Sequence, residues 1–179
     1  ALTGVSIMKL DAGLDSGPVW LSRGMAVGNS TSGELYLSLA QLGADSLLEA
    51  LPLIEQGTEP TPQDDAAVTL APKVDRVMAR IDWGRPCIEV SRRIRAMDPR
   101  PGAWTTLDGA PVKILDPSCT DDRADLAPGS LRSAHGALQV ATADSWLGVA
   151  RLRQAGKPLM DSAAWIRGLR EELGGLRFE

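Results

Sequence analysis

The chain has 179 residues, of which 44% are hydrophobic, and 19 Lys and Arg stand against 23 Asp and Glu for a net charge of −4. These values are typical of ordinary soluble globular proteins. Gly, Pro or a charged residue interrupts each apolar stretch, so we expect no membrane-spanning helix. The sequence opens at Ala1 without the charged region or cleavage site of a secretory signal, and we expect it to begin inside a longer protein.

The first predicted elements are two short strands joined by a tight loop. Apolar and polar residues alternate over 4–10 and predict a half-buried strand, and 19–25 is predicted to return beside it. Residues 11–18 between them contain two Asp, two Gly and a Pro, a composition that favours positive φ and carboxylates turned onto backbone N–H groups. Asp11 and Asp15 could therefore serve acid-base chemistry, hold a cation, or only pin the turn.

A helix is predicted next, followed by an extended segment. Thr31 and Glu34 form a capping-box pattern immediately before a run of leucines, which fixes the helix start. We expect Gly43 to end or kink this helix, and 44–56 to resume it. Residues 57–72 hold three prolines and three acids and predict a polar, extended crossover.

The later part of the chain predicts a helix, several short strands and a closing helix. Residues 86–97 have apolar residues at helical spacing with arginines between them, so a helix with a basic outer face is expected. Asp108-Gly109 is a strong hairpin signal. Strands are expected at 104–107, 111–115, 129–134, 137–141 and 146–152, with turns over 116–128. Such strands favour a small barrel or a strongly curled sheet, and 161–169 is expected to close the chain as a helix.

Cysteine and histidine are scarce. Cys87 and Cys119 are too few for a disulfide framework and have no second pair or His cluster beside them to form a zinc site, so we expect a reducing cytoplasm and no metal. The one histidine, His135, lies in Ser-Ala-His-Gly between two predicted strands and is interpreted as a turn residue.

Charge is segregated along the chain. Residues 1–72 carry two basic and nine acidic side chains, whereas 73–113 carry nine basic and five acidic ones. This pattern is expected if only the later part of the chain meets a polyanion. The alternative is a chance alternation on solvated faces, because the overall pI of about 5.1 is far from that of a dedicated nucleic-acid binder.

Several motifs together cover essentially the whole chain: residues 3–18 with Asp-Ala-Gly-Leu-Asp-Ser-Gly-Pro, 31–43, Ala79-Arg-Ile-Asp-Trp83, Ile94-Arg-Ala-Met-Asp-Pro-Arg-Pro-Gly-Ala-Trp104, and 138–160 with Gln154-Ala-Gly-Lys-Pro-Leu-Met160. In sequence and in order, these motifs resemble the methionyl-tRNA formyltransferase family. The last motifs belong to the carboxy-terminal domain, so the resemblance is specific to this branch of the folate-dependent formyltransferases.

The resemblance implies an α+β chain with two parts. Residues 1–56 would be the end of a Rossmann-like α/β formyltransferase domain, 57–73 a linker, and 74–179 an OB-like β-barrel that helps to hold tRNA. The implied activity is formyl transfer from 10-formyltetrahydrofolate, a co-substrate, to the amino group of methionine on initiator tRNA. A cytoplasmic enzyme of translation initiation is expected, with no membrane partner and no metal.

The resemblance also assigns roles to particular residues. Asp15 would be the catalytic carboxylate, which orients a histidine and assists proton transfer from the attacking amine. The residues expected to line the pterin site are Asp11, Ala12, Gly13 and Leu14. The basic residues expected to contact tRNA phosphates are Arg92, Arg93, Arg95, Arg100, Lys113, Arg151, Arg153 and Lys157, each with a solvated or ion-paired role as the alternative. Four tryptophans could stack on a base or pack in the core: Trp83, Trp104, Trp146 and Trp165.

One departure from the family limits the expected activity. The family's catalytic Asn and His precede the strand at 4–10, and no Asn-x-His occurs in these 179 residues. We therefore expect this chain to be inactive by itself and to act with the missing amino-terminal part of the same enzyme. Two alternatives remain: a formyltransferase for another amine such as a sugar nucleotide, and a non-catalytic tRNA-binding module.

Overall fold

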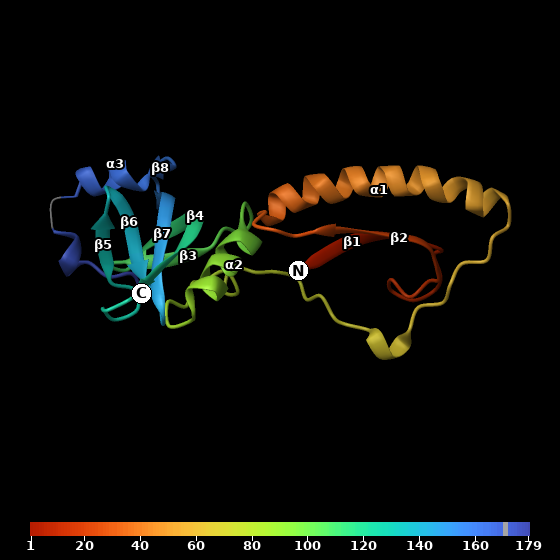
Figure 1. The fold of residues 1–179 in the computed structure, drawn as a ribbon, viewed down its shortest axis with the longest axis horizontal. Helices are drawn as coiled ribbons and strands as arrows, with labels where there is room; N and C mark the ends of the chain where they lie inside the picture. Colours follow the sequence, from red (N-terminus) through yellow and green to blue (C-terminus); the bar gives the residue numbers. More distant parts are fainter. Residues whose placement is uncertain (170–171) are drawn as a thin grey trace. The chain divides into compact units, whose positions relative to one another are not determined.

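The computed structural model (Figure 1) describes residues 1–169 and 172–179. They form two compact units, Ala1–Lys73 (unit 1) and Val74–Glu179 (unit 2). Unit 1 combines a two-stranded antiparallel sheet with a long helix, and unit 2 combines a mostly antiparallel sheet of six strands with shorter helices. The predicted mixed class of helices and strands is confirmed.

A hairpin and one helix make up most of unit 1. Strand β1 (Leu2–Met8) pairs antiparallel with β2 (Val19–Ala26), and α1 (Ser32–Glu55) lies along this hairpin (Figure 1). The expected capping box is present, because the Glu34 N–H donates to Thr31 Oγ1 at 3.2 Å and the Thr31 N–H donates to Glu34 Oε2 at 2.8 Å. The register of β1 and β2 places residues 9–18 in the connecting loop.

Helix α1 continues through Gly43, so the predicted end of the helix at this residue is wrong, and the alternative of a kink there stays a prediction. A Cβ at Gly43 would lie 3.9 Å from Val5 Cγ1, which puts the glycine on the face that packs on β1. A glycine inside a helix costs about 1 kcal/mol relative to alanine, and tertiary packing offsets a cost of that size. The face of α1 turned away from Gly43 exposes apolar side chains, among them Leu37 and Leu48.

Length and composition would also allow α1 to cross a membrane. Its most apolar stretch of 18 residues has a mean hydropathy of 1.2, and 11% of that stretch is buried. Because length and composition alone also admit helices of proteins that span no membrane, the expectation of no membrane-spanning helix stays a prediction.

The segment after α1 stays bound to the hairpin through its first residues. The backbones of Val19 and Thr61 exchange two hydrogen bonds of 2.8 and 2.9 Å, and Trp20 Nε1 donates to the Thr58 carbonyl at 2.9 Å. A short 3₁₀ turn, η1 (Asp65–Ala67), follows with Asp64 as its cap. These contacts hold residues 58–61 against β2.

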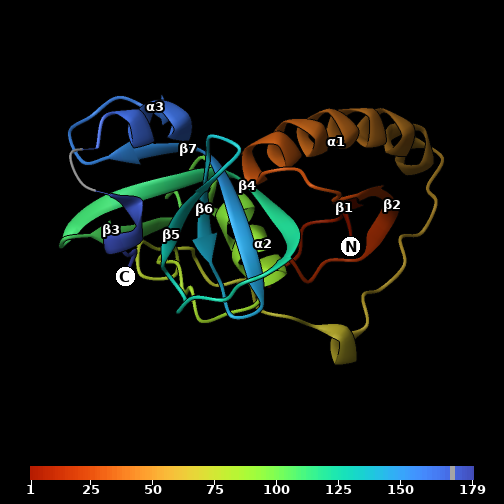
Figure 2. The ribbon, with the colours of Figure 1, turned by 60° about the vertical axis from the view of Figure 1, so that its left-hand side comes forward.

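Unit 2 is a curled sheet with helices packed on it (Figure 2). The strand order is β3-β4-β7-β6-β5, and β8 pairs with β7. The strands are β3 (Trp104–Leu107), β4 (Ala110–Arg123), β5 (Leu131–Ala134), β6 (Ala137–Ala141), β7 (Ser145–Gln154) and β8 (Met160–Asp161). The helices are α2 (Cys87–Met97), α3 (Ser162–Arg167) and the 3₁₀ turn η2 (Leu173–Gly175). Helix α2 packs on β4 and β7.

Two turn predictions are confirmed and one is wrong. Asp108 and Gly109 both have positive φ at the β3–β4 hairpin, and His135 has φ +53 in the turn between β5 and β6. Strand β4, however, continues to Arg123 through part of the predicted turn 116–128. Asp116 takes a positive φ there, yet the register of pairing with β7 is the same at Leu115 and at Pro117. Turn-forming residues are thus accommodated inside a strand where a partner strand continues the pairing.

No strand pairing joins β3 to β5 among the described residues, so the predicted barrel is not closed. The last residues of the chain form hydrogen bonds at both edges of the sheet, beside β5 and on β3. The Phe178 N–H donates to the Gly129 carbonyl next to β5 at 2.9 Å, and the Glu179 N–H donates to the Thr106 carbonyl of β3 at 3.0 Å. The carboxyl-terminal segment therefore bonds both edges of the curled sheet.

Three of the four tryptophans considered above for base stacking are buried in the core of unit 2. Trp83, Trp146 and Trp165 are buried, and Trp83 stacks on Phe178 with ring centroids 5.9 Å apart. The Trp83 indole N–H donates to Thr105 Oγ1 at 3.0 Å, which satisfies its polar atom inside the core. Trp104 is only half-buried.

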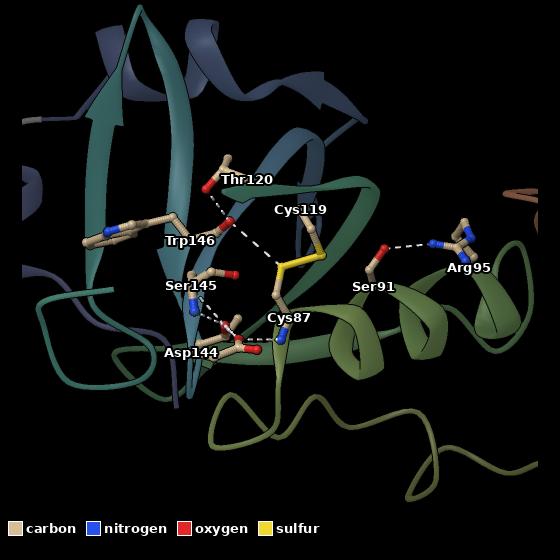
Figure 3. The surroundings of a disulfide bond; sticks show 9 residues. Cys87, Ser91, Arg95, Cys119, Thr120, Asp144, Ser145 and Trp146 are labelled. Carbon is tan, nitrogen blue, oxygen red and sulfur yellow. Dashed lines mark hydrogen bonds between the residues drawn. A yellow bond between two sulfur atoms is a disulfide. The ribbon is translucent and has the colours of Figure 1, made fainter. Parts of the chain in front are cut away.

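A disulfide bond joins Cys87, at the first turn of α2, to Cys119 of β4 (Figure 3). Their Cα atoms are 5.9 Å apart although 32 positions separate them in sequence. The sequence analysis did not expect this bond. A count of cysteines predicts the number of bridges a chain could form, but only the packing of α2 on β4 brings these two side chains together.

Candidate functional site

The loop 9–18 between β1 and β2, the Asp15 loop, is held by hydrogen bonds at its base and inside the turn. The Lys9 N–H donates to the Pro18 carbonyl at 2.9 Å and closes the base. The Asp11 carboxylate accepts from the Gly13 N–H at 2.9 Å and from Ser16 Oγ at 2.9 and 3.1 Å. Asp11 therefore pins the turn, which is one of the three roles that the sequence left open.

Gln63 adds a contact to this loop that the sequence analysis missed. Its Nε2 donates to the carbonyls of Asp15 and Gly17, at 2.8 and 2.7 Å. A Cβ at Gly17 would lie 1.7 Å from the Lys9 carbonyl oxygen, so only glycine allows the two sides of the loop to approach this closely. Gln63 lies in a polar segment without periodicity, and no sequence signal relates it to a loop 46 residues earlier.

Asp15 differs from Asp11 in where its carboxylate lies. Its backbone has φ +54, a left-handed conformation that Asp tolerates better than most residues, and the residue is exposed. Among the described residues, its carboxylate has no hydrogen-bond or ion-pair partner. The neighbouring Leu14 is 93% exposed. The loop thus presents a free carboxylate beside an apolar side chain, a combination that can act on a bound ligand.

Of the predicted basic residues of α2 and the turn after it, Arg92 and Arg93 line one cavity of about 630 Å³, and its lining also includes the acidic Asp82 and Glu89. Arg93 donates to the Met78 carbonyl at 2.5 Å, and Arg95 donates to Ser91 Oγ at 2.7 Å within the same helix. Arg92 and Arg100 are exposed. Arg93 and Arg95 therefore have structural contacts, while Arg92 and Arg100 remain open to solvent.

Three of the four predicted basic residues on the sheet do converge. Lys113, Arg153 and Lys157 line one cavity of about 470 Å³, which we call the β4–β7 pocket. Its lining also includes Arg76, which sequence reasoning missed although the residue lies in the basic block 73–113. The other lining residues are Pro101, Gly102, Trp104, Pro111, Gln154, Ala155 and Gly156, and none of the lining residues is acidic.

Arg151 is neutralised instead of free. It forms an ion pair with Asp116, and the hydrogen bond within this pair raises the pKa of the Arg151 guanidinium above its ordinary value. Arg151 and Arg153 lie two positions apart on β7 and so project from the same face. Of these two arginines, Arg153 is the one whose charge is available to a ligand.

The described residues contain no group of three or more His, Cys, Asp or Glu side chains placed to hold a metal ion.

Comparison with known proteins identifies the family. The family profile described as "Formyl transferase, C-terminal domain" matches residues 73–170, which are most of unit 2. The chain therefore belongs to the formyl transferase family that carries this domain.

Curated relatives give the branch and extend the match to unit 1. Methionyl-tRNA formyltransferase of Corynebacterium jeikeium is 40% identical over 177 residues, covering 97% of this chain and 54% of that protein. Methionyl-tRNA formyltransferase of Ruegeria pomeroyi is 40% identical over 167 residues, covering 93% of this chain and 54% of that protein. The resemblance stated from the motifs is confirmed, and the chain spans about half the length of these relatives.

A solved structure shares the fold. HypX from Aquifex aeolicus in complex with tetrahydrofolic acid matches with a TM-score of 0.69 and 23% identity, over 92% of this chain and 30% of that one. The arrangement of elements is therefore one that occurs in a folate-binding protein.

Proposed function

We propose that this chain provides the later part of a methionyl-tRNA formyltransferase, which transfers a formyl group from 10-formyltetrahydrofolate to the amino group of methionine on initiator tRNA. The observation that carries this proposal is the 40% identity to such enzymes over 97% of the chain. That identity includes both the Asp15 loop and the C-terminal domain. Because initiation of translation is a cytoplasmic process, the proposal places the protein in the cytoplasm.

The two units would have separate tasks. Residues 1–56 would belong to a Rossmann-like formyltransferase domain, 57–73 would link it to the next domain, and 74–179 would form an OB-like domain that holds the tRNA. The curled sheet of unit 2, with both free edges bonded by the carboxyl-terminal segment, supports an OB-like reading. The basic block in 73–113 supports contact with a polyanion.

Asp15 would carry the proton chemistry supplied by this chain. The amine of methionine attacks the formyl carbonyl, and the attacking nitrogen loses a proton as the new C–N bond forms. The bond between the formyl carbon and N10 of the folate breaks, and N10 takes up a proton as tetrahydrofolate leaves. A carboxylate without a protein partner, held at a loop tip by the Gln63 and Asp11 contacts, can orient the group that takes this proton. Asp15 is thus the catalytic residue that we assign.

The residues of the same loop fit one wall of a folate site. The pterin ring of a folate has flat apolar faces and polar edges, and Asp11–Leu14 offers an exposed leucine beside backbone polar groups. Leu14 would contact a ring face, whereas Asp11 would act indirectly by fixing the turn. Bound there, the folate supplies the formyl group.

Formyl-transfer assays of Asp15 variants test this proposal. The assay uses the full product of the reading frame that encodes these residues, with methionyl initiator tRNA as acceptor. Asp15→Asn is expected to lower kcat by about 10²- to 10⁴-fold, the usual contribution of a general acid or base, and to leave tRNA affinity unchanged. Asp45→Asn on α1 is the charge-matched control and should keep full activity, because Asp45 only bonds Gln41 on the same helix.

The outcomes separate the proposal from its alternatives. The 179-residue chain alone should bind tRNA without turnover, because it lacks the Asn-x-His segment. Formylation of an amino sugar nucleotide in place of methionyl-tRNA would overturn the assigned substrate. A full-length product that binds tRNA but transfers no formyl group would identify a binding module.

A further inference from the structure

The strand register places Lys113 and Arg153 side by side at the wall of the β4–β7 pocket. Lys113 of β4 is the Cα partner of Arg153 on β7. Side chains directly opposite each other in an antiparallel sheet point to the same face, with Cβ atoms about 4.5–5.5 Å apart. Arg76 and Lys157 line the same cavity, and none of the described residues that line it is acidic. Lys113 therefore lies among positive charges with no carboxylate in the cavity wall.

This environment favours the neutral form of the Lys113 amine. Like charges directly opposite each other destabilise a sheet, and loss of a proton from the lysine removes the repulsion. Burial lowers the pKa of Lys113, and the positive charges of Arg153 and Arg76 lower it further. An arginine cannot relieve the repulsion in this way, because its guanidinium stays protonated. The lysine is thus the group of this pair that gains a nucleophilic lone pair.

The Lys113 nitrogen is held in place beside open space. Its Nζ donates to the Pro101 carbonyl at 2.5 Å. A Cβ at Gly102 would lie only 2.8 Å from Nζ, so the glycine leaves room for the amine. The cavity that Lys113 lines has a volume of about 470 Å³, whereas a small molecule such as water takes up only roughly 30 Å³ in the liquid. One N–H can therefore fix the nitrogen while its lone pair meets a small electrophile.

We propose that Lys113 is a site at which CO₂ reversibly converts the lysine amine into a carbamate. The neutral Nζ attacks the carbon of CO₂, and a new N–C bond forms while one pair of π electrons moves onto an oxygen. The nitrogen then releases one proton to water, which leaves the anionic group –NH–COO⁻. Nothing is oxidised or reduced, and no reagent besides CO₂ is consumed. This modification is independent of the formyl transfer proposed above.

The same cations that favour the neutral amine stabilise the product. Carbamate formation makes the side chain an anion, so the like-charge pair of Lys113 and Arg153 becomes an ion pair. A guanidinium can donate two parallel hydrogen bonds to a carboxylate group. Arg76 is held beside the cavity by Trp104, whose ring centroid lies 5.2 Å from its guanidinium carbon. The carbamate nitrogen keeps one hydrogen, so its bond to the Pro101 carbonyl can persist.

Trapping and mapping of carbamates on the 179-residue chain tests this proposal. The chain is equilibrated with isotopically labelled CO₂ and bicarbonate at neutral pH, and a trialkyloxonium salt then converts each carbamate into a stable ester. Mass spectrometry of the digested chain compares its four lysines, which are Lys9, Lys73, Lys113 and Lys157. The label is expected to concentrate at Lys113. Because α-amino groups also react with CO₂, the map separates the amino terminus from the lysines.

Variants separate the amine from the cation that stabilises its product. Lys113→Arg keeps the positive charge without an amine, and should lose the carbamate signal of this site in the carbon NMR spectrum of the intact chain. Arg153→Gln should lower the label at Lys113 about tenfold, the usual effect of losing a charge-assisted hydrogen bond. Arg123→Gln, at the exposed end of β4 and outside the pocket, is the matched control. Thermal melts verify folding, and the wild-type map decides the proposal even where a variant does not fold.

Each outcome supports or overturns the site. Label that concentrates at Lys113 and falls in Arg153→Gln, but not in Arg123→Gln, supports it. Label spread equally over the lysines, or confined to the amino terminus, overturns it. Label at Lys113 that is unchanged in Arg153→Gln also overturns it, because the carbamate would then not pair with this arginine. None of these outcomes measures formyl transfer, so a negative result leaves the proposed function standing.

Discussion

The carboxylate of Asp144 accepts a hydrogen bond of 2.8 Å from the backbone N–H of Cys87, the first residue of α2 (Figure 3). Pro86 precedes the helix and provides no side-chain cap. Asp144 therefore caps α2 from the turn between β6 and β7, 57 residues later in the sequence. The same carboxylate accepts from Thr142 Oγ1 at 3.1 Å, so the cap is held inside its own turn.

Removing this cap should destabilise unit 2. Asp144→Ala is expected to lower the free energy of unfolding by about 1–2 kcal/mol, the range for losing a helix-capping side chain. Urea denaturation followed by tryptophan fluorescence measures the change. Asp125→Asn serves as the charge-matched control, since Asp125 is exposed and should leave the free energy of unfolding unchanged.

The contribution of Asp144 should also depend on pH. The Cys87 N–H is the main cause that lowers the pKa of Asp144 below its ordinary value of 3.8, so the folded state binds this proton less readily than the unfolded state. The stabilisation is fully present above pH 3.8 and is lost as pH falls through the folded-state pKa. The difference in unfolding free energy between wild type and Asp144→Asn should therefore shrink below about pH 4. A difference that stayed constant from pH 7 to pH 3 would contradict the assignment.

The sequence predicted local structure better than the long-range contacts that complete it. The Thr31–Glu34 capping box and the Asp108-Gly109 hairpin depend on neighbouring residues, and both are present. The hydrogen bond by which Asp144 caps α2 and the hydrogen bond from Gln63 to the Asp15 loop each join residues more than 40 positions apart. No periodicity or spacing in the sequence could therefore indicate them. Gly43 misled the prediction because glycine often ends a helix, whereas here it lies inside α1 on the face that packs on β1.

The candidate sites divide in the same way. The composition of the Asp15 loop correctly indicated a tight turn with a carboxylate turned onto a backbone N–H group. In the structure this carboxylate is that of Asp11, which accepts from the Gly13 N–H. The predicted basic residues included Lys113, Arg153 and Lys157, but the sequence could not separate them from Arg151. The ion pair of Arg151 with Asp116 depends on the pairing of β7 with β4, which joins residues 35 positions apart. Charge is readable from sequence, whereas its neutralisation is a property of the fold.

The disulfide bond gives a second stability prediction. Cys87 and Cys119 enclose 32 positions of sequence, and a loop of that length corresponds to about 3–4 kcal/mol of stabilisation in the chain-entropy account. Dithiothreitol should therefore lower the midpoint of thermal unfolding of unit 2. Cys119→Ser should unfold at the lower midpoint with or without the reductant. A midpoint of the wild type that does not respond to dithiothreitol would show that the bond is absent in solution.

The Asp15 loop should tolerate almost no side chain at Gly17. Gly17→Ala would place a Cβ 1.7 Å from the Lys9 carbonyl oxygen, so the base of the loop must open. Hydrogen exchange of the Lys9 N–H, which bonds Pro18, should accelerate at least tenfold, which corresponds to about 1.4 kcal/mol of local stability. Gly24→Ala in β2 is the matched control, because its Cβ would be 3.7 Å from the nearest atom. Equal protection of Lys9 in the two variants would refute the close approach.

The outer face of α1 should make this chain prone to self-association. Leu37 and Leu48 are 72% and 67% exposed, and contiguous apolar surface of this kind binds other apolar surface in water. Leu48→Lys should lower light scattering at high protein concentration and leave the melting midpoint nearly unchanged, because the side chain is already in water. Ala50→Lys, at a position with no exposed surface two residues along the same helix, should unfold unit 1 instead. Circular dichroism and light scattering of the two variants separate these effects. An equal loss of helix in both would mean that the outer face of α1 is covered in solution, and an unchanged scattering signal in Leu48→Lys would mean that this face does not drive association.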